Sequence, residues 1–114
     1  AQLGMEPELL YPSTLKTMTK PRVETKRRLR HTNWRGFISK AHYGIGWRNY
    51  HFLGNELIYH GGWISGYRSD IAYSPKYGVG IVILLNTEGR HTSYLTTQFL
   101  QKFFTTFRVA KNTQ

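Results

Sequence analysis

The chain has 114 residues, a formal net charge of +10 and no cysteine. This length allows one domain at most, and the lack of cysteine excludes disulfide bonds and thiolate metal sites. Apolar residues make up 39% of the sequence and aromatic residues 15%, so we expect a folded chain rather than a disordered one. The longest apolar run, residues 79–85, is too short to span a bilayer, and we expect no transmembrane segment.

The first forty residues divide into a short helical segment and a basic segment. Ser13 is placed to cap a helix that ends before Pro21. Residues 20–40 hold eight of the sixteen Lys and Arg residues with a single acid, Glu24. Because this segment has few periodic apolar positions and is flanked by Pro21 and Gly36, we expect a surface loop or crossover.

From residue 42 onward the sequence has the texture of β-strands separated by turns. The strand signals cover residues 42–52, 55–60, 66–74 and 79–86. Leu53-Gly54 separates the first two, and residues 75–78, which begin with Pro and end with Gly, separate the last two. The pattern predicts two hairpins in an antiparallel sheet of about four strands.

Residues 92–108 have the apolar spacing of one helix face. The apolar positions are Leu95, Phe99, Leu100, Phe103, Phe104 and Phe107. The fold class predicted is therefore α+β, with this C-terminal helix packed on one face of the sheet. Residues 79–85 are apolar on both alternating sides, so the other face also needs cover. We expect the first 19 residues, a second copy or another part of a longer protein to supply it.

Four short motifs follow one another in the second half of the chain. They are Tyr43-Gly44-Ile45-Gly46-Trp47, His60-Gly61-Gly62, Gly66-Tyr67-Arg68-Ser69, and a run from Pro75 through Gly78 to Asn86. In this order and spacing they resemble the C-terminal third of the serine β-lactamase and penicillin-binding-protein family, which includes class C β-lactamases, DD-peptidases and related esterases. The similarity covers roughly residues 8–108.

The resemblance implies how the chain is divided and which reaction the whole enzyme would catalyse. Residues 1–41 would be the end of a helical insertion followed by a basic loop, and residues 42–114 the C-terminal sheet and helix of a β-lactamase-like αβ domain. Such enzymes form an acyl-enzyme on the serine of an S-x-x-K motif, assisted by Y-x-N or S-x-N. Ser13 and Lys16 fit S-x-x-K, but they lie too close to the sheet for this family, so we interpret Ser13 as a helix cap. We expect this chain to lack the nucleophile and to be inactive alone.

The same resemblance assigns roles to the segment around His60. His60 would take the place of the K-T-G lysine, beside the substrate and the catalytic hydroxyl, and the backbone N–H of Trp63 would help to form an oxyanion hole. Gly61 stands where a hydroxyl residue is usual, which weakens the expectation of β-lactam turnover. Gly62 would permit close approach of a ligand. The alternatives are a structural strand histidine for His60 and simple packing for Trp63.

Tyr67 and Arg68 follow on the next strand and would shape the rim of the same site, although Arg68 could instead pair with Asp70 or Glu56. The substrate would be a β-lactam, a peptidoglycan peptide or an ester, and the compartment the periplasm or cell envelope. We expect no cofactor, and no metal because His31, His42, His51 and His91 lack ligand spacing.

Two other functions remain open from the sequence. The net charge and the basic segment are also typical of a nucleic-acid-binding module, although that segment has few interleaved aromatic residues, so nucleic acid is the less favoured partner. A non-catalytic interaction domain could also use such a sheet. The partner expected from the resemblance is instead the N-terminal half of the enzyme, or a second copy in a dimer.

Overall fold

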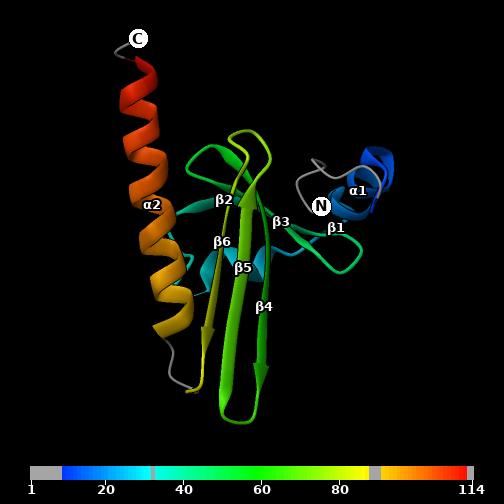
Figure 1. Ribbon diagram of the computed structural model, residues 1–114, viewed down its shortest axis with the longest axis vertical. Coiled ribbons are helices and arrows are strands. Elements are labelled where there is room, and N and C mark those ends of the chain that lie inside the picture. The colour runs from blue at the N-terminus through cyan, green and yellow to red at the C-terminus, as the bar shows by residue number, and fades with distance from the viewer. Residues whose placement is uncertain (1–8, 32, 88–90, 113–114) are drawn as a thin grey trace.

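Residues 9–31, 33–87 and 91–112 are described by the computed structural model, with side chains from 94 to 106 in the last range. They form an α+β fold, a six-stranded antiparallel sheet with a helix at each end (Figure 1). Strand order follows chain order, β1-β2-β3-β4-β5-β6. The helical elements are α1 (Pro12–Thr19), η1 (Lys26–Arg30, a 3-10 helix) and α2 (His91–Asn112). The strands are β1 (Val23–Glu24), β2 (Ile38–Tyr43), β3 (Arg48–Phe52), β4 (Asn55–Ile64), β5 (Tyr67–Ser74) and β6 (Val79–Leu85).

The sheet has six strands rather than about four, because two predictions near its first edge were wrong. Residues 20–40 are not only a loop, since they contain β1, η1 and the start of β2, and β2 runs across position 41. Residues 42–52 are not one strand. The Gly44 N–H donates to the carbonyl of Trp47 at 2.7 Å, and Gly46 has φ 74°, which closes a turn between β2 and β3.

The two predicted hairpins are confirmed. Leu53 and Gly54 have φ of 47° and 80° and connect β3 to β4 as a two-residue turn, in which glycine favours the left-handed backbone. Between β5 and β6, Gly78 has φ 65° and its N–H donates to the carbonyl of Ser74 at 2.9 Å. These turns set the register of the sheet.

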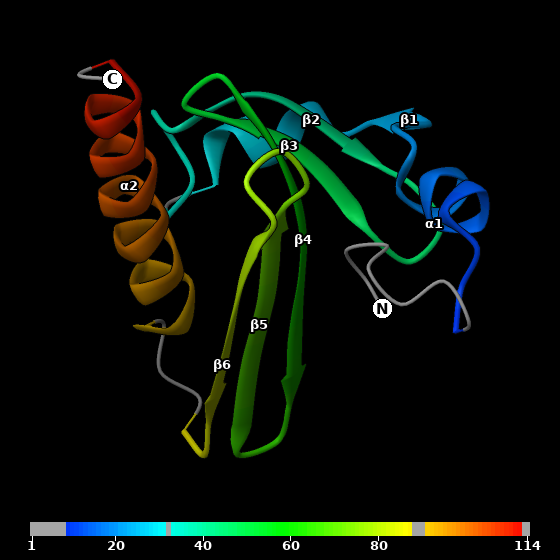
Figure 2. The same ribbon diagram turned by 45° about the horizontal axis from the view of Figure 1, so that its top comes forward.

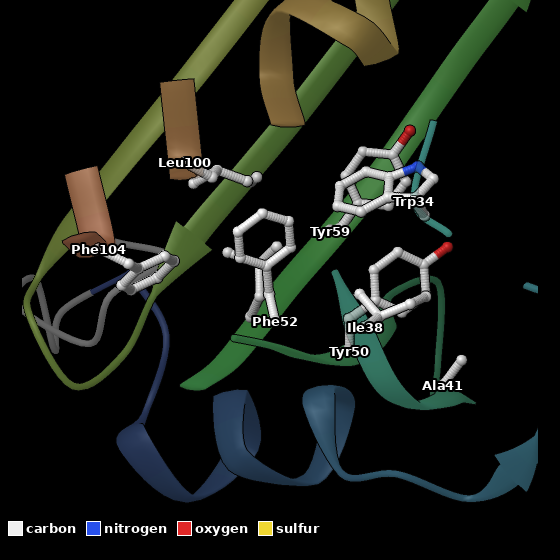
Figure 3. Packing of buried hydrophobic residues seen from close by; sticks show 10 residues of the cluster. Trp34, Ile38, Ala41, Tyr50, Phe52, Tyr59, Leu100 and Phe104 are labelled. Carbon is white, nitrogen blue, oxygen red and sulfur yellow. The ribbon is translucent and has the colours of Figure 1, made fainter. Parts of the chain in front are cut away.

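The main core lies on the face of the sheet that α2 covers, here called the α2 face. On β4 this face carries Tyr59, Gly61 and Trp63, opposite Ala72, Asp70 and Arg68 of β5. Trp34 is fully buried at its centre, with ring centroids 4.7 Å from Tyr59 and 5.0 Å from Tyr50 (Figure 3). Trp34 belongs to the segment expected to lie on the surface, so that segment contributes the central side chain of the core.

Helix α2 is longer than predicted and uses a rotated face. Leu100 and Phe104 are buried near Phe52, as Figure 3 shows, whereas Leu95 and Phe99 remain 45% and 42% exposed. Thr96 is buried and its hydroxyl donates to Oδ2 of Asp70 at 2.8 Å, which anchors the helix on β5. The side chain of Phe107 lies outside the described residues.

Helix α1 lies on the opposite side of the sheet, called here the α1 face (Figures 1 and 2). It buries Leu15, and the side-chain amide of Asn49 on β3 donates to the carbonyl of Thr19 at 3.2 Å. The helix begins at Pro12 with Tyr11 as N-cap residue and has no side-chain cap, so the prediction that Ser13 caps it was wrong. It does end before Pro21, as expected.

Most of the α1 face over the distal ends of β4, β5 and β6 is uncovered by any described residue. On this face Ile64, Tyr67, Val82 and Leu84 are 56–75% exposed. Figure 2 shows α1 packed near the other end of the sheet, beside β3, and not over these positions. The imbalance predicted from the two apolar sides of residues 79–85 is confirmed. No described helix is long and apolar enough to cross a membrane.

Candidate functional site

Strand β4 has a paired strand on both sides only at Ile58 and Tyr59, since residues 55–57 pair with β3 alone and residues 60–64 pair with β5 alone. Residues 55–59 pair with β3, and the last of these pairs is Arg48 with Tyr59. Beyond it, residues 60–64 pair only with β5. Within the described chain, this second half of β4 is therefore an open sheet edge, and it begins at His60.

The two flanking hairpins determine which backbone groups face that open edge. In a hairpin with a two-residue turn, the pair next to the turn is hydrogen-bonded, and bonded and non-bonded pairs then alternate. Ile64 and Tyr67 form that pair, so Gly62 and His60 also bond to β5. The N–H and C=O groups of Gly61 and Trp63 consequently point to the open edge. A ligand lying along this edge meets two backbone donors and two acceptors.

Side-chain packing also explains why Gly61 and Gly62, the two residues after His60, are glycines. A Cβ on Gly61 would lie 2.7 Å from the Tyr59 hydroxyl oxygen and 3.2 Å from Oδ1 of Asp70. A Cβ on Gly62, on the other face, would collide with the hydroxyl of Ser69. The hydroxyl of Tyr59 thus fills the space that a side chain at position 61 would need. Because of these two glycines, the edge of β4 has no side chain at positions 61 and 62.

The structure divides the predicted site residues between the two faces of the sheet. His60, Gly62 and Tyr67 lie on the α1 face, and Gly61, Trp63 and Arg68 lie on the α2 face. The strand alternation causes this division, so their side chains do not form one cluster. His60, Gly61, Gly62 and Trp63 share the open edge of β4, whereas Tyr67 and Arg68 lie on β5.

His60 is half-buried where β4 leaves β3, and its ring centroid lies 6.3 Å from that of Tyr43. Its imidazole makes no hydrogen bond to a described residue. Trp63 is 66% exposed, so it does not pack into the core, and the Arg68 guanidinium lies 4.5 Å from its ring centroid. Arg68 therefore stacks on Trp63 rather than pairing with Asp70 or Glu56. Tyr67 is exposed at the strand end.

Asp70 is the buried acid of this region, and its partners explain its burial. It is 4% exposed, and it accepts hydrogen bonds from the hydroxyls of Tyr59 at 3.0 Å and Thr96 at 2.8 Å. A buried carboxylate needs such donors, since an unpaired one would be strongly unfavourable. Asp70 thus ties β4, β5 and α2 together beneath the open edge, and it holds Tyr59 beside Gly61.

A group that the sequence did not single out lies on the α2 face. Arg28 of η1 donates through Nε to the hydroxyl of Tyr50 at 2.8 Å, and the pKa of His31 is lowered, first by burial and then by the charges of Arg28, Arg48 and Arg68. Sequence reasoning recognised Arg28 as part of a basic surface segment, and gave Arg48 no role. The usable signal was the position of Arg48, directly after the turn motif that ends at Trp47.

Among the described residues, no group of three or more His, Cys, Asp or Glu side chains is arranged to hold a metal ion. No family model, curated protein or solved structure matches this chain.

Proposed function

We propose that this chain supplies one wall of the active site of a serine hydrolase of the β-lactamase and penicillin-binding-protein type. In this proposal β4 is the H-x-G strand, and the nucleophilic serine and its lysine come from another segment of polypeptide. The substrate is a peptide, ester or β-lactam that is bound along the open edge and cleaved through an acyl-enzyme.

The observation that carries the proposal is the orientation of the Trp63 backbone. Attack of a serine hydroxyl on a carbonyl develops negative charge on the carbonyl oxygen, and backbone N–H groups stabilise that charge when they point at it without other partners. The hairpin register directs the N–H of Trp63 to the open edge and those of Gly62 and Ile64 to β5. The residue that the motif assigns as oxyanion donor is thus one whose N–H is available.

His60 supports the same proposal by its position and its lack of partners. It lies at the start of the open edge, and its imidazole is half-exposed without a hydrogen bond to a described residue. A histidine in this state can donate to a substrate carbonyl or carboxylate, or exchange a proton with a nearby hydroxyl. Its role in the proposal is to orient the substrate and to assist the proton transfer.

The glycine at position 61 favours esters over β-lactams within this class. A threonine or serine hydroxyl at that position would add a hydrogen bond to a substrate carboxylate. Here the nearest hydroxyl is that of Tyr59, and it donates to Asp70. A substrate that depends on that carboxylate contact loses it, whereas a simple ester does not need it.

The uncovered α1 face supports the idea that another polypeptide segment supplies the second wall of the active site. Ile64, Tyr67, Val82 and Leu84 expose large apolar side chains on this face, at the ends of β4, β5 and β6. Monomeric proteins rarely leave such a surface free, and it usually marks an interface. In the proposal this surface packs against the segment that carries the nucleophile.

The test compares the 114-residue chain with the longest natural polypeptide that contains it. Both are incubated with a fluorescent penicillin and with a p-nitrophenyl ester, and adducts are located by mass spectrometry. We expect acylation of the longer polypeptide at a serine outside residues 1–114, and none of the shorter chain. In the longer polypeptide His60→Ala should slow ester turnover by about a hundredfold. The matched control His51→Ala, on β3, should change it less than about twofold.

Two results would contradict the proposal. One is an acyl adduct on a residue of this chain, for example Ser13. The other is a longer polypeptide that turns over esters equally well with His60→Ala and with His51→Ala.

A further inference from the structure

The two end strands of the sheet are protected against pairing with another strand, whereas the open edge of β4 is not. At one end, β1 has only two residues. At the other end, β6 has α2 beside it (Figures 1 and 2). Short strands and covering helices are common ways of protecting a sheet edge. Residues 60–64 of β4 have neither protection, since both figures show no described helix or strand on their side away from β5.

The sequence of this edge also does nothing to prevent pairing. Natural proteins usually place a charged residue, a proline or a bulge at an exposed edge. Residues 60–64 contain no Lys, Arg, Asp, Glu or Pro, and their register with β5 is unbroken up to the turn. The edge therefore remains a straight template for a further strand.

The backbone groups of this edge can satisfy one another between two copies of β4. The groups that face outward are the N–H and C=O of Gly61 and Trp63, as the two hairpin registers require. In an antiparallel ladder, two hydrogen-bonded residues exchange both of their bonds. When two copies of β4 run antiparallel about a centre at Gly62, Gly61 of each copy lies opposite Trp63 of the other. Every outward-facing group of both copies is then bonded.

The neighbouring symmetric registers leave some of these groups without a partner. A centre at Gly61 places Trp63 opposite Tyr59 of the other copy, whose backbone already bonds to β3. A centre at Trp63 places Gly61 opposite Ser65, which lies in the turn before β5. The register centred on Gly62 is thus selected by the ends of the open edge itself.

Side chains fit the same register on both faces. Trp63 is 66% exposed, and its ring is fixed by the Arg68 guanidinium at 4.5 Å. It would lie opposite Gly61 of the other copy, and an aromatic side chain can cover a glycine of the adjacent strand. On the other face Ile64, which is 69% exposed, would lie opposite His60. Pairing therefore covers two large side chains that the single chain leaves in water.

We infer that two copies of this chain pair antiparallel through residues 60–64 of β4 and form one continuous sheet. Their α1 faces then lie on the same side of that sheet. A second copy occupies the position proposed above for the substrate, so pairing and substrate binding exclude one another. The inference rests on the edge geometry and not on the hydrolase chemistry. A monomeric chain would leave the hydrolase proposal standing, and a longer polypeptide that is not acylated would leave this inference standing.

The dimer should be weak and should tighten with salt. The paired segment is short, so we expect a dissociation constant in the micromolar range, as for other small and transient interfaces. Each copy has a formal net charge of +10, and the repulsion between copies is screened by ions. An increase of NaCl from about 0.05 M to about 0.3 M should therefore lower the dissociation constant. Sedimentation equilibrium of the 114-residue chain measures it.

A cysteine at the centre of the pairing tests the register. The chain has no cysteine of its own. Residues opposed in a non-hydrogen-bonded pair have Cα atoms about 4.5 Å apart, which a disulfide can bridge. Gly62→Cys is combined with Ser69→Ala, because a Cβ at position 62 would collide with the Ser69 hydroxyl. In oxidised glutathione we expect a disulfide-linked dimer. The matched control Ser69→Cys carries its thiol on the same face but one strand further from the centre, and it should remain unlinked.

Two lysine substitutions test the edge without a cross-link. Trp63→Lys should weaken the dimer at least about tenfold, because a lysine at a strand edge opposes pairing and the indole contact is lost. Val23→Lys adds the same charge to a 62% exposed apolar residue of β1, and it should change the affinity less than about twofold. Thermal unfolding shows that both variants are folded.

A chain that sediments as a monomer at millimolar concentration would overturn the inference. So would a dimer that is not linked through position 62, or equally fast linkage of Ser69→Cys, since the contact would then lie elsewhere. Equal weakening by Trp63→Lys and Val23→Lys would indicate general charge repulsion instead of edge pairing. If the chain is monomeric and an added extended peptide slows amide exchange at Gly61 and Trp63, the edge accepts a foreign strand and not a second copy.

Discussion

The hydroxyl of Tyr59 donates a hydrogen bond to Oδ1 of Asp70 at 3.0 Å, and both groups lie against the backbone of Gly61. This relationship explains why β4 has glycine in the middle of its open half. The tyrosine ring lies over the position where a side chain would project, and its hydroxyl supplies one of the donors that the buried carboxylate needs. Gly61 is thus required by the core and is at the same time exposed at the edge.

The variant Gly61→Ala should destabilise the fold by about 1–3 kcal/mol, because its Cβ would press on the Tyr59 hydroxyl and Asp70, neither of which can move freely. Gly62→Ala meets only the Ser69 hydroxyl, and the double variant Gly62→Ala with Ser69→Ala should recover most of its stability. Urea unfolding of the three proteins measures the difference. An equal loss for Gly61→Ala and for the double variant would show that the Tyr59–Asp70 pair is not the obstacle.

Thr96→Val should cost about 1–2 kcal/mol, because it removes a buried hydrogen bond to Asp70 while keeping the shape of the side chain. The loss falls on the contact between α2 and β5, so the helix should become less protected before the sheet does. Thr97 is the matched control. Its hydroxyl donates to the carbonyl of Tyr94 within α2, and Thr97→Val should affect the contact with the sheet less. Chemical denaturation followed by tryptophan fluorescence checks both variants.

Burial, and next the charge of Glu56, raises the pKa of Tyr73 to about 12. The unfolded chain has a tyrosine pKa of about 10, so the neutral phenol is favoured in the fold. This contribution to stability is complete below pH 10 and is lost as the pH rises through 12. Tyr73→Phe should remove the late step from a spectroscopic titration of tyrosinate. Because the Tyr73 hydroxyl is buried without a hydrogen-bond partner, this variant should be at least as stable as the parent.

The part of the fold that depends on local signals could be predicted from the sequence. Leu53-Gly54 and the turn ending at Gly78 fixed two hairpins, and the apolar spacing after residue 92 indicated α2. The turn between β2 and β3 was missed because Tyr43, Ile45 and Trp47 alternate with glycines as strand residues do. The Gly44–Trp47 hydrogen bond and the positive φ of Gly46 close this turn, and a Cβ on Gly44 would lie 2.7 and 2.8 Å from the carbonyl oxygens of Met18 and Lys20.

Contacts between segments that are far apart in the sequence could not be predicted from sequence patterns. The basic composition of residues 20–40 hid Trp34, whose burial depends on Tyr50 and Tyr59 from two later strands. The sequence pattern placed Leu95 and Phe99 in the core. In the structure α2 presents Thr96 to Asp70 of the sheet, and Leu95 and Phe99 are exposed. For the candidate site, the motif identified the residues of the edge. Their distribution over two faces follows from a register that only the assembled sheet sets.

Adjacent residues of β6 offer a test of the uncovered face. Val82 is 60% exposed on the α1 face, and Ile81 packs against the core on the α2 face. Val82→Lys should change stability by less than about 0.5 kcal/mol and should lower self-association, since it places a charge in the apolar surface. Ile81→Lys should destabilise the protein by at least about 2 kcal/mol. Sedimentation at several concentrations, together with thermal unfolding, separates the two effects. Unchanged association of the Val82 variant would show that copies do not meet through this surface.

Because the second half of β4 is bonded on one side only, its amide hydrogens should exchange with solvent at two alternating rates. The N–H groups of His60, Gly62 and Ile64 lie in the ladder with β5 and should exchange slowly, and those of Gly61 and Trp63 should exchange quickly. Ile58 and Tyr59, which have paired strands on both sides, should both be protected. The same strand thus joins a segment held on both sides to a half whose backbone is ready to pair. A partner that binds along the edge should slow the two fast amides and leave the others nearly unchanged.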